Sequence, residues 1–327
     1  MKTGLLLILL SISSICSQAN EIFKKKLFLM GCNFEVTVVA SGQPEADAYI
    51  ELAKSEIVRI EKLISSWDEA SETSLINRNA GREPVKVSSE LIQLIERSLA
   101  ISKLTDGAFD ISYASMDKIW QFDGSMKEIP SKNEIQKSIA LIGYQDIDIN
   151  KTASTVFLEK AGMKIGFGGI GKGYAADRAK ELLRAKGVVA GIINASGDMN
   201  TWGVQPNGNP WEVAITNPLQ KNTAFGLLPI TEGAVVTSGN YEKYVVFDNV
   251  RYSHIIDPRT GYPSTGILSV TIFAPSAELA DALATSVFVM GIEVGLNRIE
   301  QLKGVECIIV DEKGELHQTE NIKIKSK

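Results

Sequence analysis

Residues 166–183 read GFGGIGKGYAADRAKELL, a glycine-rich turn followed by a segment of helical composition. Gly166, Gly168 and Gly171 satisfy G-x-G-x-x-G, the fingerprint of dinucleotide-binding folds. The same stretch satisfies G-x-x-x-x-G-K through Lys172, which is a P-loop without its final Ser or Thr. The two patterns predict different folds, so the surrounding residues must decide between them.

Neither nucleotide-binding pattern is complete. A P-loop needs a hydroxyl directly after its lysine to bind Mg²⁺, and Gly173 stands there. A dinucleotide-binding fold needs a clear strand before the first glycine, whereas the preceding residues, KAGMKIGF, are only weakly strand-like. The stretch therefore predicts a tight turn before a helix. The free N–H groups and positive dipole end of such a helix, with the charge of Lys172, favour a phosphate ligand.

The composition is typical of a globular chain with a sizeable core. Of 327 residues, 44% are hydrophobic and 22% are charged, and the net charge is −5. An acidic chain without a basic cluster argues against nucleic acid as the main partner. Helices and strands mix without steady βαβ alternation, which favours an α+β fold with mixed or antiparallel sheets and packed helices.

Hydrophobic periodicity predicts the individual elements. Helices are expected at residues 46–64, 89–104, about 174–186 and 277–290. Strands are expected at residues 27–40, as one strand or a strand pair, and in the runs TVFLE, VAGIINA and VECIIV. We expect loops in SSWDEASETSLINRNAG and TDGAFDIS, short peripheral pieces at 114–150, and frayed residues at the C-terminal end.

The first 19 residues predict a secretory signal peptide. Lys2 gives a positive start, an apolar run follows, and residues 17–19 have the small-x-small form of a cleavage site. The run is too short for a spanning helix, and no later stretch is long and apolar enough to span a membrane. We expect an exported mature chain, residues 20–327, forming a single domain. Lipidation of Cys16 is the alternative way to process this segment.

Two further cysteines, Cys32 and Cys307, could pair in an exported protein. Cys307 lies in the buried-looking run CIIV, which favours two separate core cysteines over a disulfide.

A carboxylate and a hydroxyl share one face of the last predicted helix. Asp281 and Thr285 are four residues apart, and the rest of that face is Ala, Leu, Ser and Val. One interpretation is a site for a hard cation, because Mg²⁺ prefers such oxygens and completes its shell with phosphates and water. The alternative is an Asp satisfied by a nearby backbone group or by an Arg.

The chain has only two histidines. His317 lies in the polar tail, and we expect it at the surface without a role. His254 lies in an apolar alternation near Ser238, Asp257 and Arg259, a setting that suits a general base as well as a structural residue. A Ser-His-Asp hydrolase is the competing interpretation, but the sequence lacks a G-x-S-x-G elbow.

Eight short motifs, in order, resemble the ApbE family, the FAD:protein FMN transferases. Between residues 30 and 291 they read MG, SxxSxxN, TDGAFD, GGIxKGYAxD, SGD, TSGNY, YSHIIDPRTGYP and ADALAT. No single motif is specific, so their order carries the resemblance. It implies an ApbE-like, T-fold-like architecture. It also implies Mg²⁺-dependent transfer of FMN from FAD to a threonine hydroxyl of an acceptor protein, with release of AMP.

The resemblance also implies roles for individual residues. Asp281 and Thr285 match metal-ligating side chains, and Gly171 matches the residue whose carbonyl binds the metal. His254 matches the proposed catalytic base, and Lys172 is expected near the FAD pyrophosphate. The positions expected to contact the flavin substrate are Met30, Trp67, Ala108, Phe109, Asp110, Gly168, Tyr174 and Ile255.

This sequence departs from the family pattern at three places. Gly171 replaces the usual Ala, and a glycine there predicts a looser loop. Trp67 stands where many members have Tyr, which keeps an aromatic face for stacking. Residues 166–167, Gly-Phe, replace Asp-Leu, which removes a carboxylate near the phosphates or the ribose.

The resemblance further implies the partners. The expected acceptors are subunits of membrane redox complexes, of the Na⁺-pumping NADH:quinone oxidoreductase or Rnf type, and they suit a periplasmic protein, attached to the inner membrane if Cys16 is lipidated. An FAD pyrophosphatase, giving FMN and AMP, would use the same site with water as nucleophile. A non-catalytic flavin-binding protein would need neither His254 nor the metal pair. A flavin- or NAD-dependent oxidoreductase rests on the glycine pattern alone.

Overall fold

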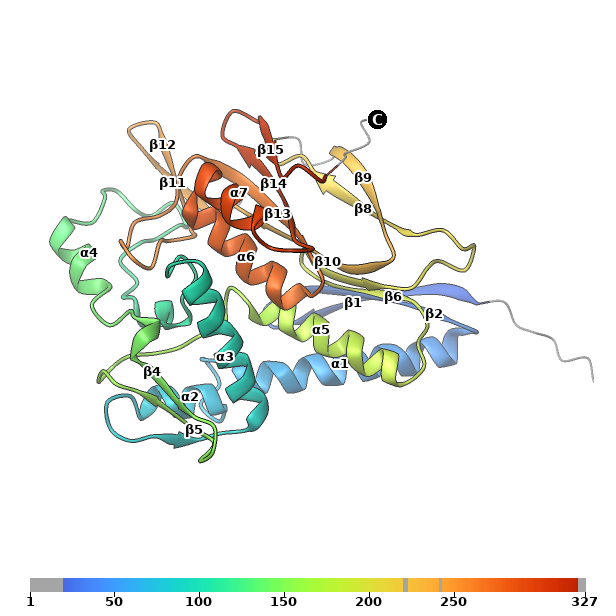
Figure 1. Cartoon of the computed structure of the whole chain (residues 1–327), viewed down its shortest axis with the longest axis horizontal. Coiled ribbons are helices and arrows are strands. Elements are labelled where there is room, and N and C mark those ends of the chain that lie inside the picture. Colours follow the sequence, from blue (N-terminus) through green and yellow to red (C-terminus); the bar gives the residue numbers. More distant parts are fainter. Residues whose placement is uncertain (1–19, 220–222, 241–242, 323–327) are drawn as a thin grey trace, which may run out of the picture.

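The computed structural model describes residues 20–219, 223–240 and 243–322. Its largest feature is an eight-stranded sheet in the order β1-β2-β6-β7-β10-β13-β14-β15 (Figure 1). All neighbouring strands in this sheet are antiparallel. The strands are β1 (Glu21–Leu29), β2 (Cys32–Ala40), β6 (Gly191–Ala195), β7 (Asp198–Trp202), β10 (Glu232–Gly239), β13 (Ile267–Ala274), β14 (Glu306–Asp311) and β15 (Leu316–Gln318).

Three helices cover one face of this sheet (Figure 1). They are α1 (Gln43–Ile64), α5 (Gly171–Ala185) and α6 (Ala277–Met290). In α1 the buried residues recur every three or four positions, so the helix turns one apolar stripe toward the sheet and α5. They are Ala46, Ile50, Ala53, Ile57, Ile60 and Ile64. α6 is buried on most sides, because it packs against β10, β13 and α5.

A hairpin of β8 (Trp211–Thr216) and β9 (Ala224–Ile230) packs on part of the opposite face, where Trp211 clusters with Val39 and Ala190. The remaining elements lie around this core. The strands are β3 (Val85–Lys86), β4 (Ile147–Asn150), β5 (Thr155–Leu158), β11 (Tyr244–Phe247) and β12 (Val250–Ser253). The helices are α2 (Glu72–Arg78), α3 (Ser89–Leu104), α4 (Lys132–Ser138) and α7 (Ile292–Glu300), with short 3-10 turns at Ile111–Ser115 and Tyr144–Asp146.

The close crossing of α5 and α6 depends on two residues of the glycine-rich stretch. Gly173 lies so near α6 that a Cβ atom at this position would be 2.1 Å from the carbonyl oxygen of Ala277. Asp177, one turn later, accepts hydrogen bonds from the backbone N–H groups of Ala277 (2.8 Å) and Glu278 (2.9 Å). It therefore caps the N-terminus of α6 from another helix. Gly173 and Asp177 together fix α6, and with it Asp281 and Thr285, against α5.

The sequence predicted most of these elements. The helices at 89–104 and 277–290 are confirmed, and so is a strand pair at 27–40, although β1 already begins at Glu21. The loop predicted for SSWDEASETSLINRNAG is wrong, because Ser71 caps α2 there by accepting a hydrogen bond from the N–H of Ser74. α5 begins at Gly171, three residues earlier than predicted. The C-terminal end is not frayed throughout, because β15 pairs with β14, and α7 was not predicted.

Cys32 and Cys307 are both free, so the prediction of separate cysteines is confirmed; Cys307 is buried and Cys32 half-buried. The predicted signal peptide, residues 1–19 with Cys16, lies outside the described residues, as does Tyr241 of the TSGNY motif. Within the described ranges, no helix is both long enough and apolar enough to cross a bilayer.

Candidate active site

A cavity of about 890 Å³ opens at one end of the eight-stranded sheet. The β1–β2 turn, the β6–β7 turn and the end of β10 meet there with α6 and the start of α5. All predicted site residues except Tyr174 line this cavity: Met30, Trp67, Ala108, Phe109, Asp110, Gly168, Gly171, Lys172, His254, Ile255, Asp281 and Thr285. The fold thus brings together residues that are up to 255 positions apart in the sequence.

A buried cluster of charges lies in the cavity wall. Lys172 Nζ is 2.5 Å from Asp198 Oδ2 and 3.5 Å from Asp281 Oδ2. Burial opposes the charge of the ammonium, but the attraction of Asp281 and Asp198 outweighs it and raises the pKa of Lys172. Burial and the neighbouring Asp281 carboxylate raise the pKa of Asp198. Two carboxylates facing one ammonium make this wall favourable for an additional cation.

The donors of this cluster fit a Mg²⁺-class cation. A Cβ atom at Gly169 would be 3.2 Å from Thr285 Oγ1, so the Thr285 hydroxyl faces the glycine turn. Asp281 Oδ2 accepts a hydrogen bond from the N–H of Gly173 (3.1 Å), which is the backbone partner foreseen in the alternative interpretation. Asp198 Oδ2 is buried beside the Lys172 ammonium, 2.5 Å from Nζ. Two buried carboxylates that share one ammonium, next to a hydroxyl, form a set of hard oxygens that such a cation would satisfy.

Gly171 is the first residue of α5, and the looser loop predicted for it is wrong because the residue is helical. A carbonyl oxygen has two lone pairs, so the Gly171 carbonyl can accept a hydrogen bond within the helix and still bind a ligand. A Cβ atom here would be 2.8 Å from Ile64 Cδ1. In this chain the Ile64 side chain therefore occupies the space that an alanine methyl would take.

His254 follows β12 directly, lines the cavity and is half-buried. Its Nδ1 lies 3.2 Å from the carbonyl oxygen of Lys243. A carbonyl only accepts hydrogen bonds, so Nδ1 carries the proton and Nε2 of the neutral ring keeps its lone pair. Burial lowers the pKa of His254, although the Lys243 carbonyl opposes this shift. The ring is thus prepared to accept a proton at Nε2 near neutral pH.

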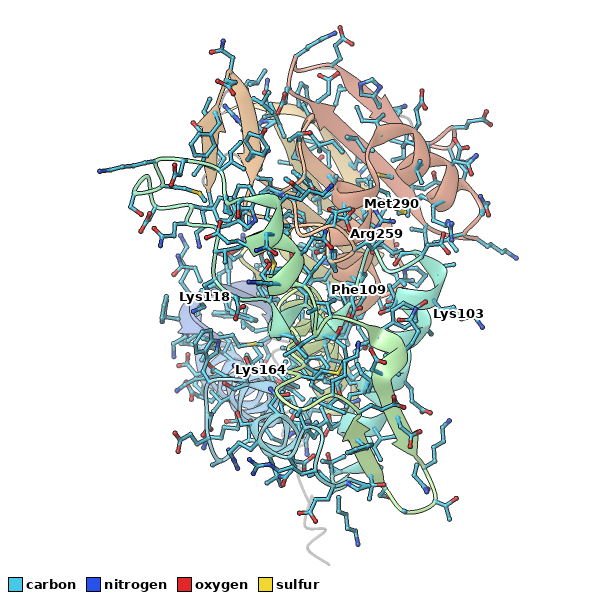
Figure 2. The ribbon with its side chains drawn as sticks, turned by 90° about the vertical axis from the view of Figure 1, so that its left-hand side faces the viewer. Lys103, Phe109, Lys118, Lys164, Arg259 and Met290 are labelled. Atoms are coloured by element: carbon cyan, nitrogen blue, oxygen red, sulfur yellow. The ribbon has the colours of Figure 1, made fainter. Side chains whose placement is uncertain are left out.

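The apolar wall of the cavity includes the predicted flavin-contacting residues Met30 and Phe109. Figure 2 shows Phe109 near the middle of the molecule and Lys118 toward its edge. The Asp110 carboxylate accepts hydrogen bonds from Ser112 (2.6 and 2.7 Å) and from the N–H of Tyr144 (2.9 Å), so it holds the TDGAFD loop in place. Trp67 is 81% exposed at the rim, where Lys118 Nζ lies 4.8 Å from the centre of its ring.

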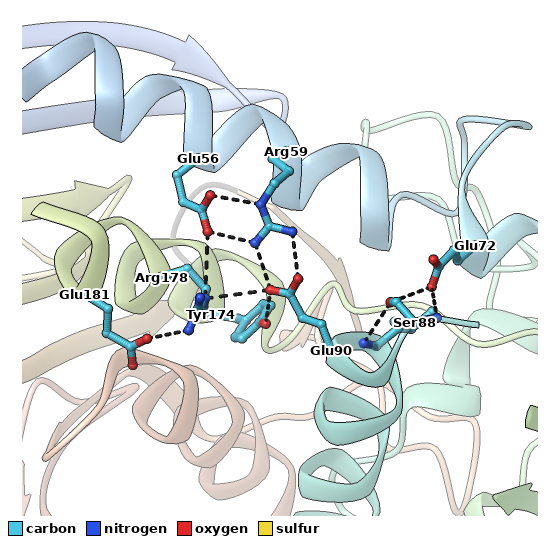
Figure 3. A network of polar contacts seen from close by, with 9 residues as sticks. Glu56, Arg59, Glu72, Ser88, Glu90, Tyr174, Arg178 and Glu181 are labelled. Carbon is cyan, nitrogen blue, oxygen red and sulfur yellow. Dashed lines mark hydrogen bonds and ion pairs between the residues drawn. The ribbon is translucent and has the colours of Figure 1, made fainter. Parts of the chain in front are cut away.

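Tyr174 does not belong to this cavity. Its ring is buried and its hydroxyl donates to Glu90 (2.7 Å), within a polar network of α1, α3 and α5 that also contains Arg59 and Arg178 (Figure 3). Tyr174 is two residues beyond Lys172 on α5, and such a spacing turns the two side chains to different sides of a helix. The GGIxKGYAxD motif includes Tyr174, but a motif does not give side-chain direction. The geometry of α5 directs the Tyr174 side chain toward α3.

The cavity contains polar residues that the sequence did not assign to the site: Glu61, Ser65, Ser66, Ser196, Asp198 and Thr237. Asp198 matters most because it binds Lys172. Asp198 is part of the SGD motif and lies in β7, whereas its partner Lys172 lies in α5. Only the fold therefore reveals the pair.

The competing interpretations lose support. Asp257 pairs with Arg259 (2.9 Å), and among the described residues the ring of His254 hydrogen-bonds a carbonyl rather than a carboxylate, so no Ser-His-Asp relay forms there. No strand precedes Gly166, as a dinucleotide-binding fold would need, because the last one, β5, ends at Leu158. His317 contacts Asp311 (3.0 Å) at the β14–β15 hairpin, outside the cavity.

Comparison with known proteins decides the family. The model of the ApbE family matches residues 30–309. The chain belongs to the ApbE family. Two curated relatives, both called FAD:protein FMN transferase, come from Klebsiella pneumoniae (strain 342) and Treponema pallidum (strain Nichols). The first is 32% identical over 293 residues, which is 89% of this chain and 90% of the relative. The second is 30% identical over 289 residues, covering 83% and 80%.

Solved ApbE structures have the same architecture. The ApbE protein of Thermotoga maritima superposes with a TM-score of 0.83 at 33% identity, covering 92% of this chain and 97% of that one. The apo form of the Pseudomonas stutzeri flavinyl transferase ApbE gives 0.82 at 26% identity, covering 92% and 95%. The ApbE resemblance and the α+β fold with antiparallel sheets are thereby confirmed.

Proposed function

We propose that this ApbE protein transfers FMN from FAD to a threonine hydroxyl of an acceptor protein and releases AMP. The observation that carries the proposal is one cavity wide enough for a dinucleotide, lined both by a half-buried histidine and by a carboxylate–hydroxyl–lysine cluster. The relatives named FAD:protein FMN transferase cover most of this chain, which supports the same reaction here.

The reaction exchanges a phosphoanhydride bond of FAD for a phosphoester bond to the acceptor. The acceptor hydroxyl attacks the phosphorus on the flavin side of the FAD pyrophosphate, and its proton passes to Nε2 of His254. The bond from that phosphorus to the bridging oxygen breaks, and AMP departs with this oxygen. FMN remains attached to the acceptor through a new phosphoester. In-line positioning and charge neutralisation lower the barrier of such a displacement.

The charged wall would neutralise the phosphates through the cations that it holds. We propose that Asp281, Thr285 and the Gly171 carbonyl hold Mg²⁺, with Asp198 close by. When bound, Mg²⁺ would neutralise phosphate charge and orient the pyrophosphate. Lys172 supplies a second positive charge, and Asp198 holds its ammonium group in the wall.

We also propose the cellular setting. The signal-peptide pattern of residues 1–19 supports export to the periplasm, and lipidation of Cys16 would attach the protein to the inner membrane. An acceptor subunit of a membrane redox complex, of the Na⁺-pumping NADH:quinone oxidoreductase or Rnf type, would be reached from there.

A product analysis separates transfer from hydrolysis. The protein is incubated with FAD and Mg²⁺, with and without an acceptor fragment that carries a Ser-Gly-Ala-Thr site, and FAD, FMN and AMP are followed by chromatography. Transfer predicts AMP formation that depends on the acceptor and no equivalent amount of free FMN. Equal amounts of AMP and free FMN, regardless of acceptor, would identify an FAD pyrophosphatase instead. Intact FAD despite demonstrated FAD binding would identify a flavin-binding protein.

A further inference from the structure

We propose that the acceptor polypeptide docks as an extended strand along the free edge of β1, which guides its threonine to the cavity. The inference rests on the proposed transferase function and identifies how the second substrate is recognised. β1 is the first strand of the eight-stranded sheet, and β2 is its only neighbour among the described strands. An edge strand presents unpaired N–H and C=O groups that can pair with another chain.

The β1–β2 turn determines which backbone groups are free. Met30 (φ 51°) and Gly31 (φ 71°) both have positive φ, as a two-residue type I′ hairpin turn requires. The flanking pair, Leu29 and Cys32, is then the hydrogen-bonded pair, and the pairs alternate along the strand. The outward N–H and C=O groups therefore belong to the even-numbered residues, Ile22, Lys24, Lys26 and Phe28.

The side chains of these same four residues are exposed. The odd-numbered Phe23, Leu27 and Leu29 pack into the core, and Lys25 pairs with Glu51 of α1, so the odd face is occupied. On the even face, Phe28 is 74% exposed and Ile22 is 37% exposed, with two exposed lysines between them. The edge of β1 thus offers free backbone groups, two positive charges and an apolar side chain on one face.

The edge leads to the reaction site. β1 runs toward the cavity, and the turn residues that follow it, Met30 and Gly31, line the cavity wall. A strand rises about 3.4 Å per residue, so Phe28 is about 7 Å from Met30 along the chain. A partner strand paired with β1 would reach the cavity mouth within about two residues beyond Phe28. Trp67, which is exposed and also lines the cavity, offers a second apolar contact.

The chemistry of the edge specifies the partner. Lys24 and Lys26 favour carboxylates at alternate positions of the incoming strand, and Phe28 favours an apolar residue next to the threonine. Lysines on an edge strand also prevent association of the protein with itself, so a purely protective role is the competing explanation. The two explanations predict different effects of charge reversal on acceptor recognition.

A charge-swap experiment tests the docking edge. The full chain, with FAD and Mg²⁺, labels two synthetic peptides whose Ser-Gly-Ala-Thr site is flanked by alternating Glu or by alternating Lys. We expect the Lys24→Glu/Lys26→Glu variant to raise the KM for the Glu peptide about tenfold and to lower it for the Lys peptide, with kcat unchanged. Lys25→Glu is the matched control, because its side chain lies on the α1 face, and it should leave both KM values near wild type.

Each outcome decides the proposal. Unchanged KM values in the double variant, or equal effects of Lys25→Glu, would overturn the docking edge while leaving the transferase function intact. Cleavage of FAD by the wild-type protein without labelling of either peptide would instead reject the transferase function and, with it, the docking edge. A Glu peptide methylated on alternate backbone nitrogens should also lose affinity, since its strand can no longer pair with β1.

Discussion

His254 should govern the pH dependence of transfer. Burial lowers its pKa below the usual value of 6.5, so the neutral, proton-accepting ring predominates at pH 7. Activity should therefore be present above this pKa and be lost as the pH falls through it, with a midpoint below 6.5. The measurement is the pH profile of kcat/KM for FAD at saturating acceptor.

The other histidine provides the control for this profile. His317→Gln should keep the acid limb unchanged, whereas His254→Ala should slow transfer at least about a hundredfold, the usual scale of a general base. FAD binding should survive in both variants. An acid limb that persists unchanged in His254→Ala would reject this residue as the base.

Asp281 should carry the metal dependence. The Asp281 and Asp198 carboxylates lie around the Lys172 ammonium, so replacing Asp281 removes one oxygen ligand of the proposed Mg²⁺. We expect Asp281→Ala to abolish Mg²⁺-dependent turnover and also the rise in melting temperature on adding Mg²⁺ to the FAD-free protein. Glu293→Ala, an exposed position of α7, is the control and should retain both responses. A normal Mg²⁺ response in Asp281→Ala would show that the metal binds elsewhere.

At the scale of the elements, Gly173 should be intolerant of any side chain. A methyl group there would meet the backbone of α6, which cannot move aside as a flexible side chain can. We expect Gly173→Ala to lower the free energy of unfolding by about 2–3 kcal/mol or more. Gly168→Ala is the matched control, since no atom lies within 4 Å of its Cβ position, and denaturant unfolding should find it near wild type. Equal stability of the two variants would contradict the packing account.

Asp177 should contribute as much to the stability of the fold as Gly173 does, because of the hydrogen bonds that it accepts. Asp177→Ala would leave the N–H groups of Ala277 and Glu278 without their acceptor inside the protein. We expect a loss of about 2–4 kcal/mol, measured by denaturant unfolding, because buried donors lose charge-assisted bonds. Asp177→Asn, which keeps one acceptor oxygen, should recover part of this loss. No difference between the Ala and Asn variants would argue against the cap.

At the scale of the whole molecule, local patterns predicted what is determined locally. The isoleucines of α1 and the small residues of α6 follow the helical period, so both helices were evident in the sequence. The strand at 316–318 was missed because it exists only through pairing with β14. The α2 helix was missed because its residues look polar, although Ser71 was a visible cap signal.

The site was predictable to the extent that motifs fix positions. The ordered motifs identified twelve of the residues that the fold brings to the cavity. They did not give side-chain direction, so Tyr174 was expected in the cavity although its side chain points to Glu90. They also did not reveal the Lys172–Asp198 pair, which joins α5 to β7. Direction and pairing depend on how α5 lies between α1 and α6, which no local pattern encodes.

The most direct test of the central claim is the intact mass of an acceptor fragment after incubation with this protein, FAD and Mg²⁺. The account predicts that the acceptor gains the mass of one FMN less one water, at its Ser-Gly-Ala-Thr threonine, and that one AMP is released for each acceptor labelled. An acceptor of unchanged mass, in a reaction where FAD is consumed, would contradict it.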